Sequence, residues 1–485
     1  MPPNKAERIP TSSGFSALSR KTKIVCTLGP ATESEATLRD LLQAGMNVAR
    51  LNCSHGTHAE HGERISRIRE LADEAQTPVA ILLDLAGPKV RVGSFQAGSV
   101  ELRAGDRFTL TTRSVEGTSH KVSVSYLDLP REVKVGDVLL LSDGALELAV
   151  QQVTEEEIHC QVVVGETLSS HKGVNCPSGL LGLPILGEKD VRDLQFGLDQ
   201  GVDYIGLSFV RTAEDVRAAK QEIAQRGGFT PIIAKIETHA ALAAFDDILT
   251  EADGIMVARG DLAIETPFSH VPMIQKQLIH RANQQAKPVI TATQMLWSMV
   301  HTPRPTRAEV ADVANAIIDG SDAVMLSEET AIGQHPIRAV QTMEAIATDT
   351  ERAWLRLFSP DTQEQDDSTD STGIEAIAQA ACHMATHLGI DALVTVTLSG
   401  LTARFVAKFR PLQPIIAATP KLETYRQLAL VRGVSPLLLP DIATNRGEMI
   451  ELTRHFLRQH GWQGKRVIIA SSISADRNVL TTDIL

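Results

Sequence analysis

Lys235 and Glu237 lie two residues apart in the stretch PIIAKIET, residues 231–238. The apolar residues of this stretch are typical of a buried strand, and side chains two apart on a strand point to the same face. A cation and an anion would therefore lie side by side on an apolar strand. Because a charge is costly to bury unless it is paired or binds a ligand, this pair is a candidate for chemistry.

Other polar residues follow runs rich in Val and Ile, where strands are expected to end. They supply a second cation, further carboxylates, hydroxyls and an amide, which is a set that can bind and transform a charged ligand. These residues are Arg50 and Asn52, followed by Ser54 and His55; Asp84; Asp261 in ARGDLA; Thr293; and Ser327.

Glu237 and Asp261 are carboxylates from neighbouring runs, and such a pair suits Mg²⁺, which keeps part of its water shell. The alternative for Glu237 is a simple ion pair with Lys235 at the rim of a barrel. Arg50 and Lys235 are cations suited to phosphate. ARGDLA runs from a strand into a helix, so the N–H groups of Gly260 and Asp261 can bind an anion, although an ordinary tight turn is the alternative. Together these groups suit a small molecule that carries phosphate and carboxylate.

Eight short apolar runs, each followed by a helix-like stretch, must position these side chains. Alternating strands and helices predict a parallel α/β sheet, and eight units predict a closed (β/α)₈ TIM barrel with functional residues at the carboxyl ends of its strands. The runs are residues 23–29, 47–53, 79–85, 204–209, 231–237, 254–259, 287–293 and 322–327.

The barrel pattern is interrupted and extended by other segments. Residues 87–186 show period-two patterns and predict an inserted β-barrel domain that acts as a lid, while residues 374–485 predict an α/β domain with an open, mostly parallel sheet. We expect a barrel domain at 21–86 and 187–358, an N-terminal tail at 1–20 and a linker at 359–373.

Composition excludes several classes of protein. The chain has 485 residues and a formal net charge of −12, so no overall basic field attracts nucleic acid or an anionic membrane. No apolar run approaches the roughly 20 residues of a membrane span, and the N-terminus lacks the apolar core of a signal peptide. The five cysteines are scattered, as in a reducing compartment, and a cytoplasmic location is expected.

Nine phrases of the sequence closely resemble pyruvate kinase, and the resemblance covers nearly the whole chain after the N-terminal tail. The phrases are KTKIVCTLGPAT, GMNVARLNCSHGTH, LDLAGPKVRVG, HKGVN, LSFVR, AKIET, IMVARGDLAIE, KPVITATQML and PRPTRAEVADVANAIIDGSDAVMLSEETA. The resemblance implies a phosphotransferase that makes pyruvate and ATP from phosphoenolpyruvate and ADP, the last step of glycolysis. It also implies Mg²⁺ or Mn²⁺ as a cofactor and a homotetramer.

The resemblance assigns roles to individual residues. Lys235 is similar to the lysine that contacts the transferring phosphoryl group and stabilises the enolate, and Glu237 and Asp261 match the metal ligands. Arg50 and Arg91 match arginines on the phosphate, and Thr293 and Ser327 match the region where enolpyruvate is protonated. Substrate-binding positions also include Ala258, Arg259 and Gly260; nucleotide-side positions match Thr27, Pro30, Asn52, His55, Arg91, Lys172 and Asn175; and a lid position matches Asp143.

The sequence departs from the commoner family pattern after Asp84. Where the family usually has Thr-Lys-Gly-Pro-Glu, this chain has Leu-Ala-Gly-Pro-Lys, which ends in Lys89. Asn52, Ser54 and Asp84 match the surroundings of the family's K⁺ ion, so the pattern resembles the K⁺-independent subgroup, with the Lys89 ammonium in place of K⁺. The alternative is an exposed lysine at the lid hinge. Trp297 and Glu328 are further departures.

The stretch TVTLSGLTAR resembles the family's effector-phosphate loop, and its candidates are Thr397, Ser399, Gly400 and Thr402. A glycine turn before a capped helix is the alternative. Because the usual final Gly-rich loop is missing, a sugar monophosphate or AMP is favoured over fructose 1,6-bisphosphate, with no effector as a further alternative. Two other functions remain open: a Mg²⁺ lyase acting on a pyruvate enolate, which would not need the lid or the nucleotide phrases, and a catalytically inactive metabolite sensor.

Overall fold

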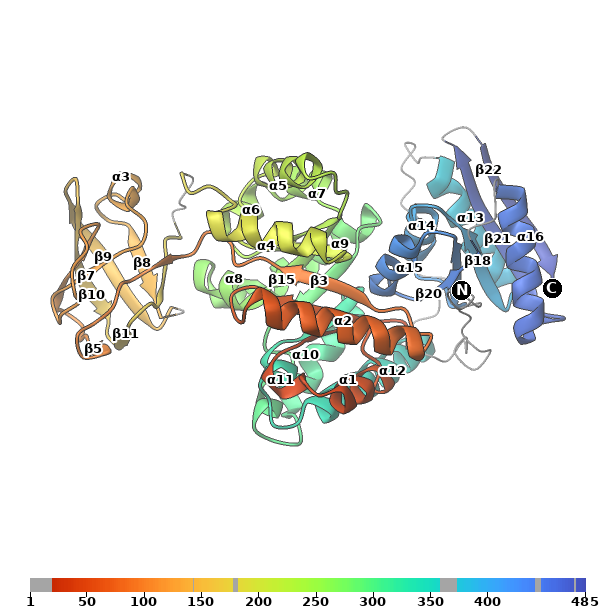
Figure 1. Cartoon of the computed structure of the whole chain (residues 1–485), viewed down its shortest axis with the longest axis horizontal. Coiled ribbons are helices and arrows are strands. Elements are labelled where there is room, and N and C mark those ends of the chain that lie inside the picture. The colour runs from red at the N-terminus through yellow and green to blue at the C-terminus, as the bar shows by residue number, and fades with distance from the viewer. Residues whose placement is uncertain (1–19, 143, 178–181, 358–372, 441–445, 475–476) are drawn as a thin grey trace. The chain divides into compact units, whose positions relative to one another are not determined.

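Eight parallel strands form a closed barrel in the computed structural model, which describes residues 20–142, 144–177, 182–357, 373–440, 446–474 and 477–485. The strand order around the barrel is β1-β17-β16-β15-β14-β13-β3-β2, so the predicted TIM barrel is confirmed. Two of its strands, β3 and β15, are labelled in Figure 1. Each strand falls within one of the eight predicted runs. Their bounds are β1 Lys23–Thr27, β2 Val48–Asn52, β3 Ala80–Asp84, β13 Tyr204–Leu207, β14 Ile232–Ile236, β15 Gly254–Ala258, β16 Val289–Ala292 and β17 Ala323–Leu326.

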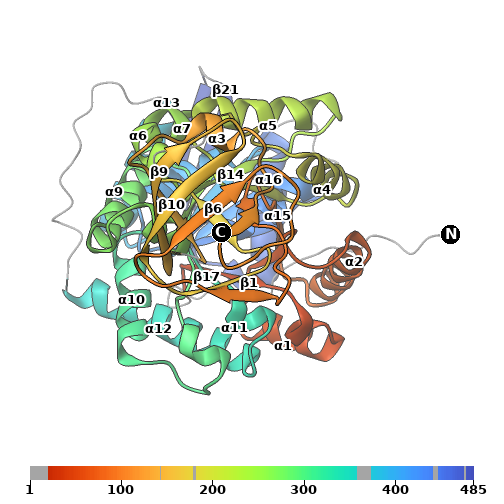
Figure 2. The same ribbon diagram turned by 90° about the vertical axis from the view of Figure 1, so that its left-hand side faces the viewer.

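The barrel helices begin with conventional caps. In α2 and α10 a threonine, Thr57 or Thr306, exchanges hydrogen bonds with a glutamate three residues later, so two terminal N–H groups are satisfied. Helices α1, α10, α11 and α12 lie side by side (Figure 2). The helices are α1 Glu35–Gln43, α2 His58–Glu74, α4 Glu188–Asp199, α5 Ala213–Gln225, α6 His239–Ala243, α7 Phe245–Glu251, α8 Arg259–Glu265, α9 Val271–Gln284, α10 Arg307–Ile318, α11 Glu328–Ala331 and α12 Pro336–Leu357, with 3₁₀ turns η2 Pro30–Thr32, η3 Phe268–His270 and η4 Trp297–Val300.

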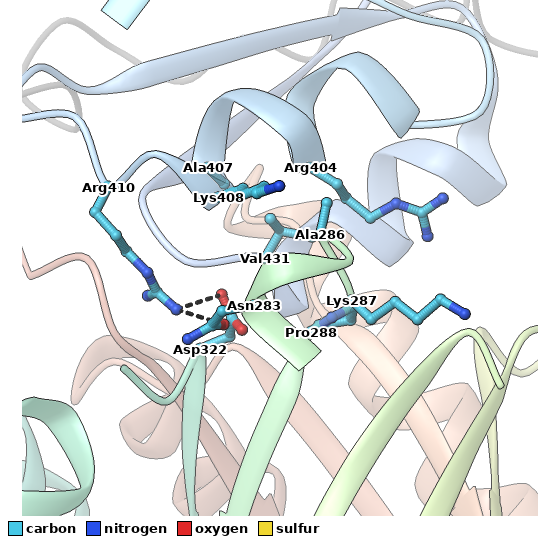
Figure 3. A pocket seen from close by; sticks show the side chains of 10 residues that line it. All are labelled: Asn283, Ala286, Lys287, Pro288, Asp322, Arg404, Ala407, Lys408, Arg410 and Val431. Carbon is cyan, nitrogen blue, oxygen red and sulfur yellow. Dashed lines mark hydrogen bonds and ion pairs between the residues drawn. The ribbon is translucent and has the colours of Figure 1, made fainter. Parts of the chain in front are cut away.

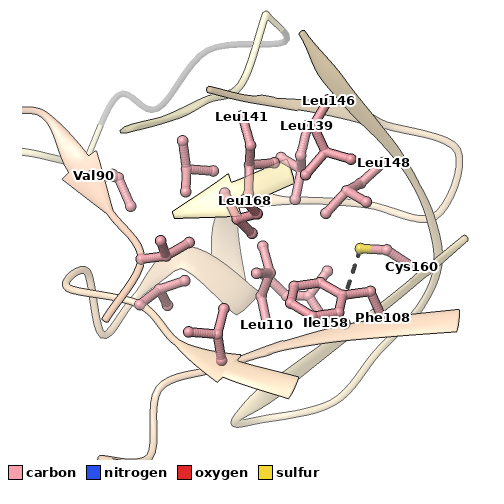
Figure 4. Packing of buried hydrophobic residues seen from close by; sticks show 14 of the residues in the cluster. Val90, Phe108, Leu110, Leu139, Leu141, Leu146, Leu148, Ile158, Cys160 and Leu168 are labelled. Carbon is pink, nitrogen blue, oxygen red and sulfur yellow. Dashed lines mark hydrogen bonds between the residues drawn. The ribbon is translucent and has the colours of Figure 1, made fainter. Parts of the chain in front are cut away.

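The segment between β3 and α4 forms a β domain, as predicted. Seven of its strands form one sheet in the order β4-β12-β8-β9-β10-β6-β7, and an isolated bridge pairs Val92 with Val124, the residues that directly follow the outer strands β4 and β7. Alternate residues point inward and form one apolar core, which includes Phe108, Leu139 and Leu148 (Figure 4). The elements are β4 Val90–Arg91, β5 Ser99–Glu101, β6 Arg107–Thr111, β7 Lys121–Ser123, α3 Leu129–Glu132, β8 Val138–Leu141, β9 Leu146–Val153, β10 Glu157–Val164, β11 Thr167–Ser169 and β12 Gly173–Asn175.

The C-terminal part has an open sheet in the order β20-β19-β18-β21-β22, which confirms the predicted α/β domain. The last strand, β22, runs antiparallel to β21 and was not predicted from the sequence. Apolar residues of α13 and α14 cover one face of the sheet, and those of α16 cover the other. The elements are α13 Gly373–Leu388, β18 Ala392–Val396, α14 Leu401–Lys408, β19 Ile415–Thr419, α15 Leu422–Gln427, η6 Leu428–Leu430, β20 Val434–Leu438, α16 Arg446–Leu457, η7 Arg458–Trp462, β21 Arg466–Ser474 and β22 Arg477–Ile484.

Partly buried cations link the C-terminal domain to the barrel. Arg410 donates to Asn283 Oδ1 at 2.8 Å and lies 3.8 Å from Asp322 Oδ1, whereas the side chains of Arg404 and Lys287 extend away from these groups (Figure 3). Lys23 Nζ, at the start of β1, donates to the carbonyl of Val434 at 2.8 Å. The beginning of β1 therefore belongs to the junction as well as to the barrel.

The chain forms two compact units. The first comprises residues 20–83, 200–205 and 277–485, apart from the segments outside the described ranges, and the second comprises residues 84–199 and 206–276. All but the last residue of the expected N-terminal tail, and most of the expected linker, lie outside the described residues. Arg20, the last residue of that tail, donates to Asn47 Oδ1 at 3.0 Å. Among the helices that the structure describes, none is both long and apolar enough to cross a membrane.

Candidate active site

Lys235 lies at the carboxyl end of β14 in the second unit, surrounded by acceptors. Its Nζ lies 2.9 Å from Glu237 Oε1 and 3.2 Å from Asp84 Oδ1, and it donates to Ser208 Oγ at 2.7 Å. The side chain of Lys235 is 11% exposed, and those of the two carboxylates are 2% and 1% exposed. The structure thus places Lys235 and Glu237 on one face of the strand, and it adds a second carboxylate to the pair.

Glu237 is an enclosed carboxylate with two defined partners and an acidic neighbour. Its Oε2 accepts the backbone N–H of Phe209 at 2.7 Å, while Oε1 meets Lys235. Burial raises the pKa of Glu237; the Lys235 ammonium opposes this shift, and the charge of Asp261 adds to it. Asp261 lies in the first turn of α8, the helix that follows β15.

Glu265, at the end of α8, extends this acidic region. It accepts the N–H of His239 at 3.1 Å, and burial raises its pKa to about 7. The side chain of Asn175 stabilises its charged form, whereas Asp261 and Glu237 oppose it. These carboxylates repel one another, and a bound divalent cation would relieve that repulsion.

The donor set fits an ion that keeps waters and takes oxygen atoms from substrates. In the part of the chain that the structure describes, no three His, Cys, Asp or Glu side chains are arranged to hold a metal ion by themselves. Mg²⁺ is commonly bound through one or two protein carboxylates together with substrate phosphates and water. Glu237 and Asp261 would supply two such carboxylates.

Lys89, in the segment that leads into the inserted β domain, faces the same acidic group. Its Nζ lies 3.7 Å from Asp261 Oδ1 and 5.7 Å from the centre of the Phe209 ring. Gly173 on β12 leaves room for this side chain, because a Cβ there would come within 2.5 Å of Lys89 Cε. The side chain of Lys89 is 23% exposed and is directed toward Asp261.

Strained backbone occurs where barrel strands end. Phe209, two residues past β13, has φ +56°, and Thr293 and Gln294, just past β16, have φ +68° and +55°. Positive φ is uncommon outside glycine and is unusual for a β-branched residue such as Thr293. Such strain persists only when surrounding contacts hold it, and it often marks functional positions. For Phe209 the holding contact is the N–H bond to Glu237.

Arg50 and Thr27 form a polar pair in the first unit. Arg50, at 8% exposure, donates to Thr27 Oγ1 at 2.9 Å, and Thr27 Oγ1 donates to the carbonyl of Leu326 at 3.0 Å. Glu328 follows Ser327 at the end of β17; burial and Glu329 raise its pKa, whereas Arg50 lowers it. The departure at Glu328 therefore places a carboxylate within the field of Arg50.

Glu329 organises two strand-end loops of the first unit. It is fully buried; its Oε1 accepts the N–H of Leu296 at 3.0 Å, and its Oε2 accepts that of Ser327 at 2.7 Å. One carboxylate thus fixes the loop after β16, which contains Thr293, and the loop after β17. Burial raises the pKa of Glu329, and the backbone N–H donors lower it.

The remaining predicted positions lie on loops and in the β domain. Asn52 Oδ1 accepts the N–H of Ser54, and the carbonyl of His55 contacts His61. Arg91 is exposed and donates to the carbonyl of His171, next to the exposed Lys172. Pro30 opens η2, Ala258 ends β15, and Arg259 and Gly260 open α8, whereas Asp143 lies outside the described residues.

The loop before α14 has the geometry of a glycine turn. Gly400 has φ +77° and donates its N–H to Thr397 Oγ1 at 2.9 Å. Thr397 and Thr402 are buried, whereas Ser399 is exposed. This geometry serves the start of α14, as in the alternative considered for this loop.

Sequence reasoning missed four groups that hold these residues: Ser208, Phe209, Glu265 and Glu329. A signal was present for Ser208, which follows the apolar run YIGL, and for Glu265, which lies four residues after Asp261 on the same helix. The backbone role of Phe209 and the bridging role of Glu329 depend on loops that are distant in sequence, so no local pattern marks them.

Comparisons with known proteins give one consistent result. The family model for the pyruvate kinase barrel domain matches residues 19–340, and that for the pyruvate kinase alpha/beta domain matches residues 375–485. Pyruvate kinase 2 of Synechocystis sp. is 50% identical over 453 residues, covering 91% of this chain and 76% of the relative. Pyruvate kinase of Geobacillus stearothermophilus is 48% identical, covering 92% and 76%. The crystal structure of a pyruvate kinase from Cryptosporidium parvum matches with a TM-score of 0.88 and 36% identity over 99% of each chain.

Proposed function

This chain belongs to the pyruvate kinase family and is a phosphotransferase that makes pyruvate and ATP from phosphoenolpyruvate and ADP; from that premise we propose which of its residues perform the reaction. The observation that carries the proposal is the Lys235 ammonium, held by Ser208 between Glu237 and Asp84, with Asp261 acting on Glu237. Phosphoryl transfer depends mainly on positioned charge, and this cluster supplies both signs.

Lys235 is proposed to contact the phosphoryl group as it leaves phosphoenolpyruvate and to stabilise the enolate that remains. Arg50 and Arg91 bind phosphate oxygens, as guanidinium groups do with two parallel hydrogen bonds. Ala258, Arg259 and Gly260 line the substrate, and Thr293 and Ser327 serve the protonation of enolpyruvate. Nucleotide contacts are assigned to Thr27, Pro30, Asn52, His55, Arg91, Lys172 and Asn175.

Members of the family generally need a divalent metal, and Glu237 and Asp261 would hold it here. Bound Mg²⁺ would neutralise negative charge on the phosphate oxygens. The residues of the chain keep this region ready: Phe209 and Lys235 orient the two oxygens of Glu237, and Glu265 adds negative charge beside Asp261.

Lys89 is proposed to replace the K⁺ ion that Asn52, Ser54 and Asp84 would otherwise help to bind. Its ammonium is already 3.7 Å from Asp261, and Gly173 accommodates its side chain, so a fixed positive charge is built into the chain. Lysine differs from a free ion because its charge does not depend on the K⁺ concentration.

A coupled assay of pyruvate formation in buffer without K⁺ or Na⁺ tests this proposal. We expect full turnover by the unaltered chain, loss of most turnover in Lys89→Ala, and partial recovery of that variant with added K⁺. Lys121→Ala is the matched control, because Lys121 lies in the same β domain but pairs with Glu157 at 2.7 Å. A requirement of the unaltered chain for K⁺ would overturn the role of Lys89.

Regulation and assembly complete the proposal. Thr397, Ser399, Gly400 and Thr402 are proposed to bind a phosphorylated effector such as a sugar monophosphate or AMP, and the chain is proposed to form a homotetramer. Titrating these compounds against turnover, with Ser399→Ala as the variant, tests the effector. Native mass spectrometry tests the tetramer, and a monomer would contradict it.

A further inference from the structure

Asp190 joins the two segments that connect the inserted β domain to the barrel. It lies in the first turn of α4 and is only 3% exposed. Its Oδ1 accepts the N–H of Gly87, in the outgoing segment, at 3.0 Å, and its Oδ2 accepts the N–H of Gly187, in the returning segment, at 3.1 Å. One carboxylate therefore bonds to peptides that are 100 positions apart in the chain.

The bond to Gly187 is ordinary, but the bond to Gly87 is not. Gly187 directly precedes α4, and an acidic residue in the first turn of a helix often accepts the N–H at the helix start. Helix formation requires nothing from Gly87, which belongs to a different segment of the chain. The second bond therefore indicates a role that lies outside the helix itself.

Gly87 is held in a conformation that other residues do not readily adopt. Its φ is +71°, and a Cβ there would lie 2.8 Å from Ser208 Cβ and 3.0 Å from the Ser208 carbonyl oxygen. The residue before Ala86 is fixed as well, since Leu85 N–H donates to the carbonyl of Gly206 at 2.9 Å. The outgoing segment thus leaves the barrel along one defined path.

Hydrogen bonds through Ser208 connect the outgoing segment to Lys235, the candidate catalytic lysine. Ser208 Oγ donates to the carbonyl of Leu85 at 2.7 Å and accepts from Lys235 Nζ at 2.7 Å. On the other side of Gly87, the N–H of Lys89 donates to the Gly87 carbonyl at 2.9 Å. Gly87 therefore lies between a segment bonded to Ser208 and the residue whose ammonium faces Asp261.

We propose that Asp190 is a positioning residue for phosphoryl transfer, which sets where the inserted β domain presents Lys89 and Arg91. Releasing Gly87 would let the outgoing segment move while the helix start at Gly187 is kept. The inference rests on the proposed function in one respect, namely that Lys89 and Arg91 act in the reaction. Misplacing reacting groups by about 1 Å can lower rates by about 100-fold, so a hinge contact of this kind has a measurable effect.

The test compares Asp190→Asn with Asp193→Asn. The amide at position 190 keeps one acceptor and turns its NH₂ group toward an N–H, so at least one of the two bonds is lost. Asp193 lies on the same helix, is equally buried at 3%, and pairs with Lys189 Nζ at 2.6 Å. It therefore controls for the loss of a buried carboxylate in α4.

Three quantities are measured for both variants: hydrogen exchange of peptides that cover residues 85–90 and 183–189, kcat and KM for each substrate, and the thermal midpoint. For Asp190→Asn we expect faster exchange in the 85–90 peptide and about a ten-fold or larger loss of kcat/KM, at a thermal midpoint similar to that of Asp193→Asn. Equal loss of kcat/KM in the two variants, or kinetics for Asp190→Asn within two-fold of the unaltered chain (about 0.4 kcal/mol), would overturn the inference.

Two further variants keep the result decisive. Asp190→Glu retains both acceptors and moves them by one methylene, so it is expected to recover part of kcat/KM. It replaces the Asn variant where that protein does not fold, and faster exchange in the 85–90 peptide with unchanged kinetics then overturns the inference. Lys89→Ala, measured in parallel, separates the two proposals. If Lys89→Ala leaves turnover unchanged, Lys89 has no role in the reaction. The role of Asp190 is decided separately, by the difference in kcat/KM between Asp190→Asn and Asp193→Asn.

Discussion

Lys235 shows why a buried cation is retained at the end of an apolar strand. Its charge is balanced by two carboxylates, Glu237 and Asp84, which are themselves almost fully buried. Removing one member of such a cluster leaves its partners charged in a poorly solvated place, which costs more than the pair contributes. The residue is thus required for stability as well as for the proposed chemistry.

Lys235→Met is therefore expected to lower turnover by about 1,000-fold or more and to lower the free energy of unfolding by about 3 kcal/mol. The coupled pyruvate assay and chemical denaturation measure the two effects. Lys220→Met is the control, because Lys220 makes a more exposed ion pair with Asp253, at 3.2 Å, and its loss should cost less than about 1 kcal/mol. An active Lys235→Met variant would refute the proposed role.

Gly173 gives a second way to test the role of Lys89 without changing the lysine. A Cβ at position 173 would meet Lys89 Cε at 2.5 Å, and because that side chain is flexible we expect it to move aside rather than the strand to unfold. Gly173→Ala should then lower turnover in K⁺-free buffer and regain part of it with K⁺. If K⁺ stimulates Gly173→Ala no more than it stimulates the unaltered chain, then Lys89 is either not displaced by the substitution or not needed for turnover.

The residues that could be predicted from the sequence share one property: each belongs to a local pattern. Lys235 and Glu237 follow from two-residue alternation, and Asp261 follows from its place after an apolar run. Glu329 could not be predicted in the same way, since it acts by accepting N–H groups from two loops. Its neighbour Glu328 drew attention as a departure from the family pattern, although Glu329 makes the contacts.

Secondary-structure elements were predicted most reliably where burial enforces a pattern. All eight barrel strands fall within apolar runs, because strands of a parallel barrel are enclosed on both faces. Strand β22 escaped prediction because its residues, RNVLTTDI, do not alternate regularly. Its position follows from pairing with β21, which is a tertiary contact.

Lys23, at the start of β1, should make the stability of the chain depend on pH. Burial lowers the pKa of Lys23 to about 7, with Arg20 adding to the shift and Glu351 opposing it. The unfolded chain, in which this lysine titrates near 10.5, then binds more protons than the folded chain between pH 7 and 10.5. Lys23 therefore makes stability rise with pH across that window, and its penalty is largest below pH 7.

Lys23→Met should remove this contribution. The free energy of unfolding should therefore increase more, or decrease less, from pH 7 to pH 9 in the unaltered chain than in the variant. Denaturant titrations at the two pH values measure the difference. Lys465→Met is a control, because Lys465 is half exposed and pairs with Asp391 at 3.4 Å. Parallel pH profiles for Lys23→Met and the unaltered chain would contradict the assignment.

The whole chain should respond to its metal through linkage. A ligand that binds only the folded state stabilises it by about 2.7 kcal/mol at 100 times its dissociation constant. We expect Mg²⁺ to raise the thermal midpoint of the unaltered chain, and chelation by EDTA to abolish turnover reversibly. Asp261→Asn should weaken both responses, whereas Asp253→Asn should not, since Asp253 pairs with Lys220. An equal response of both variants to Mg²⁺ would contradict the proposed ligand.

The inserted β domain leaves and re-enters the barrel beside a single carboxylate, and the strands that flank it, β3 and β13, are neighbours in the barrel order. The insertion therefore interrupts no ladder of hydrogen bonds. A segment with this topology can differ in length or in its own fold without breaking the pairing of the barrel strands on either side of it.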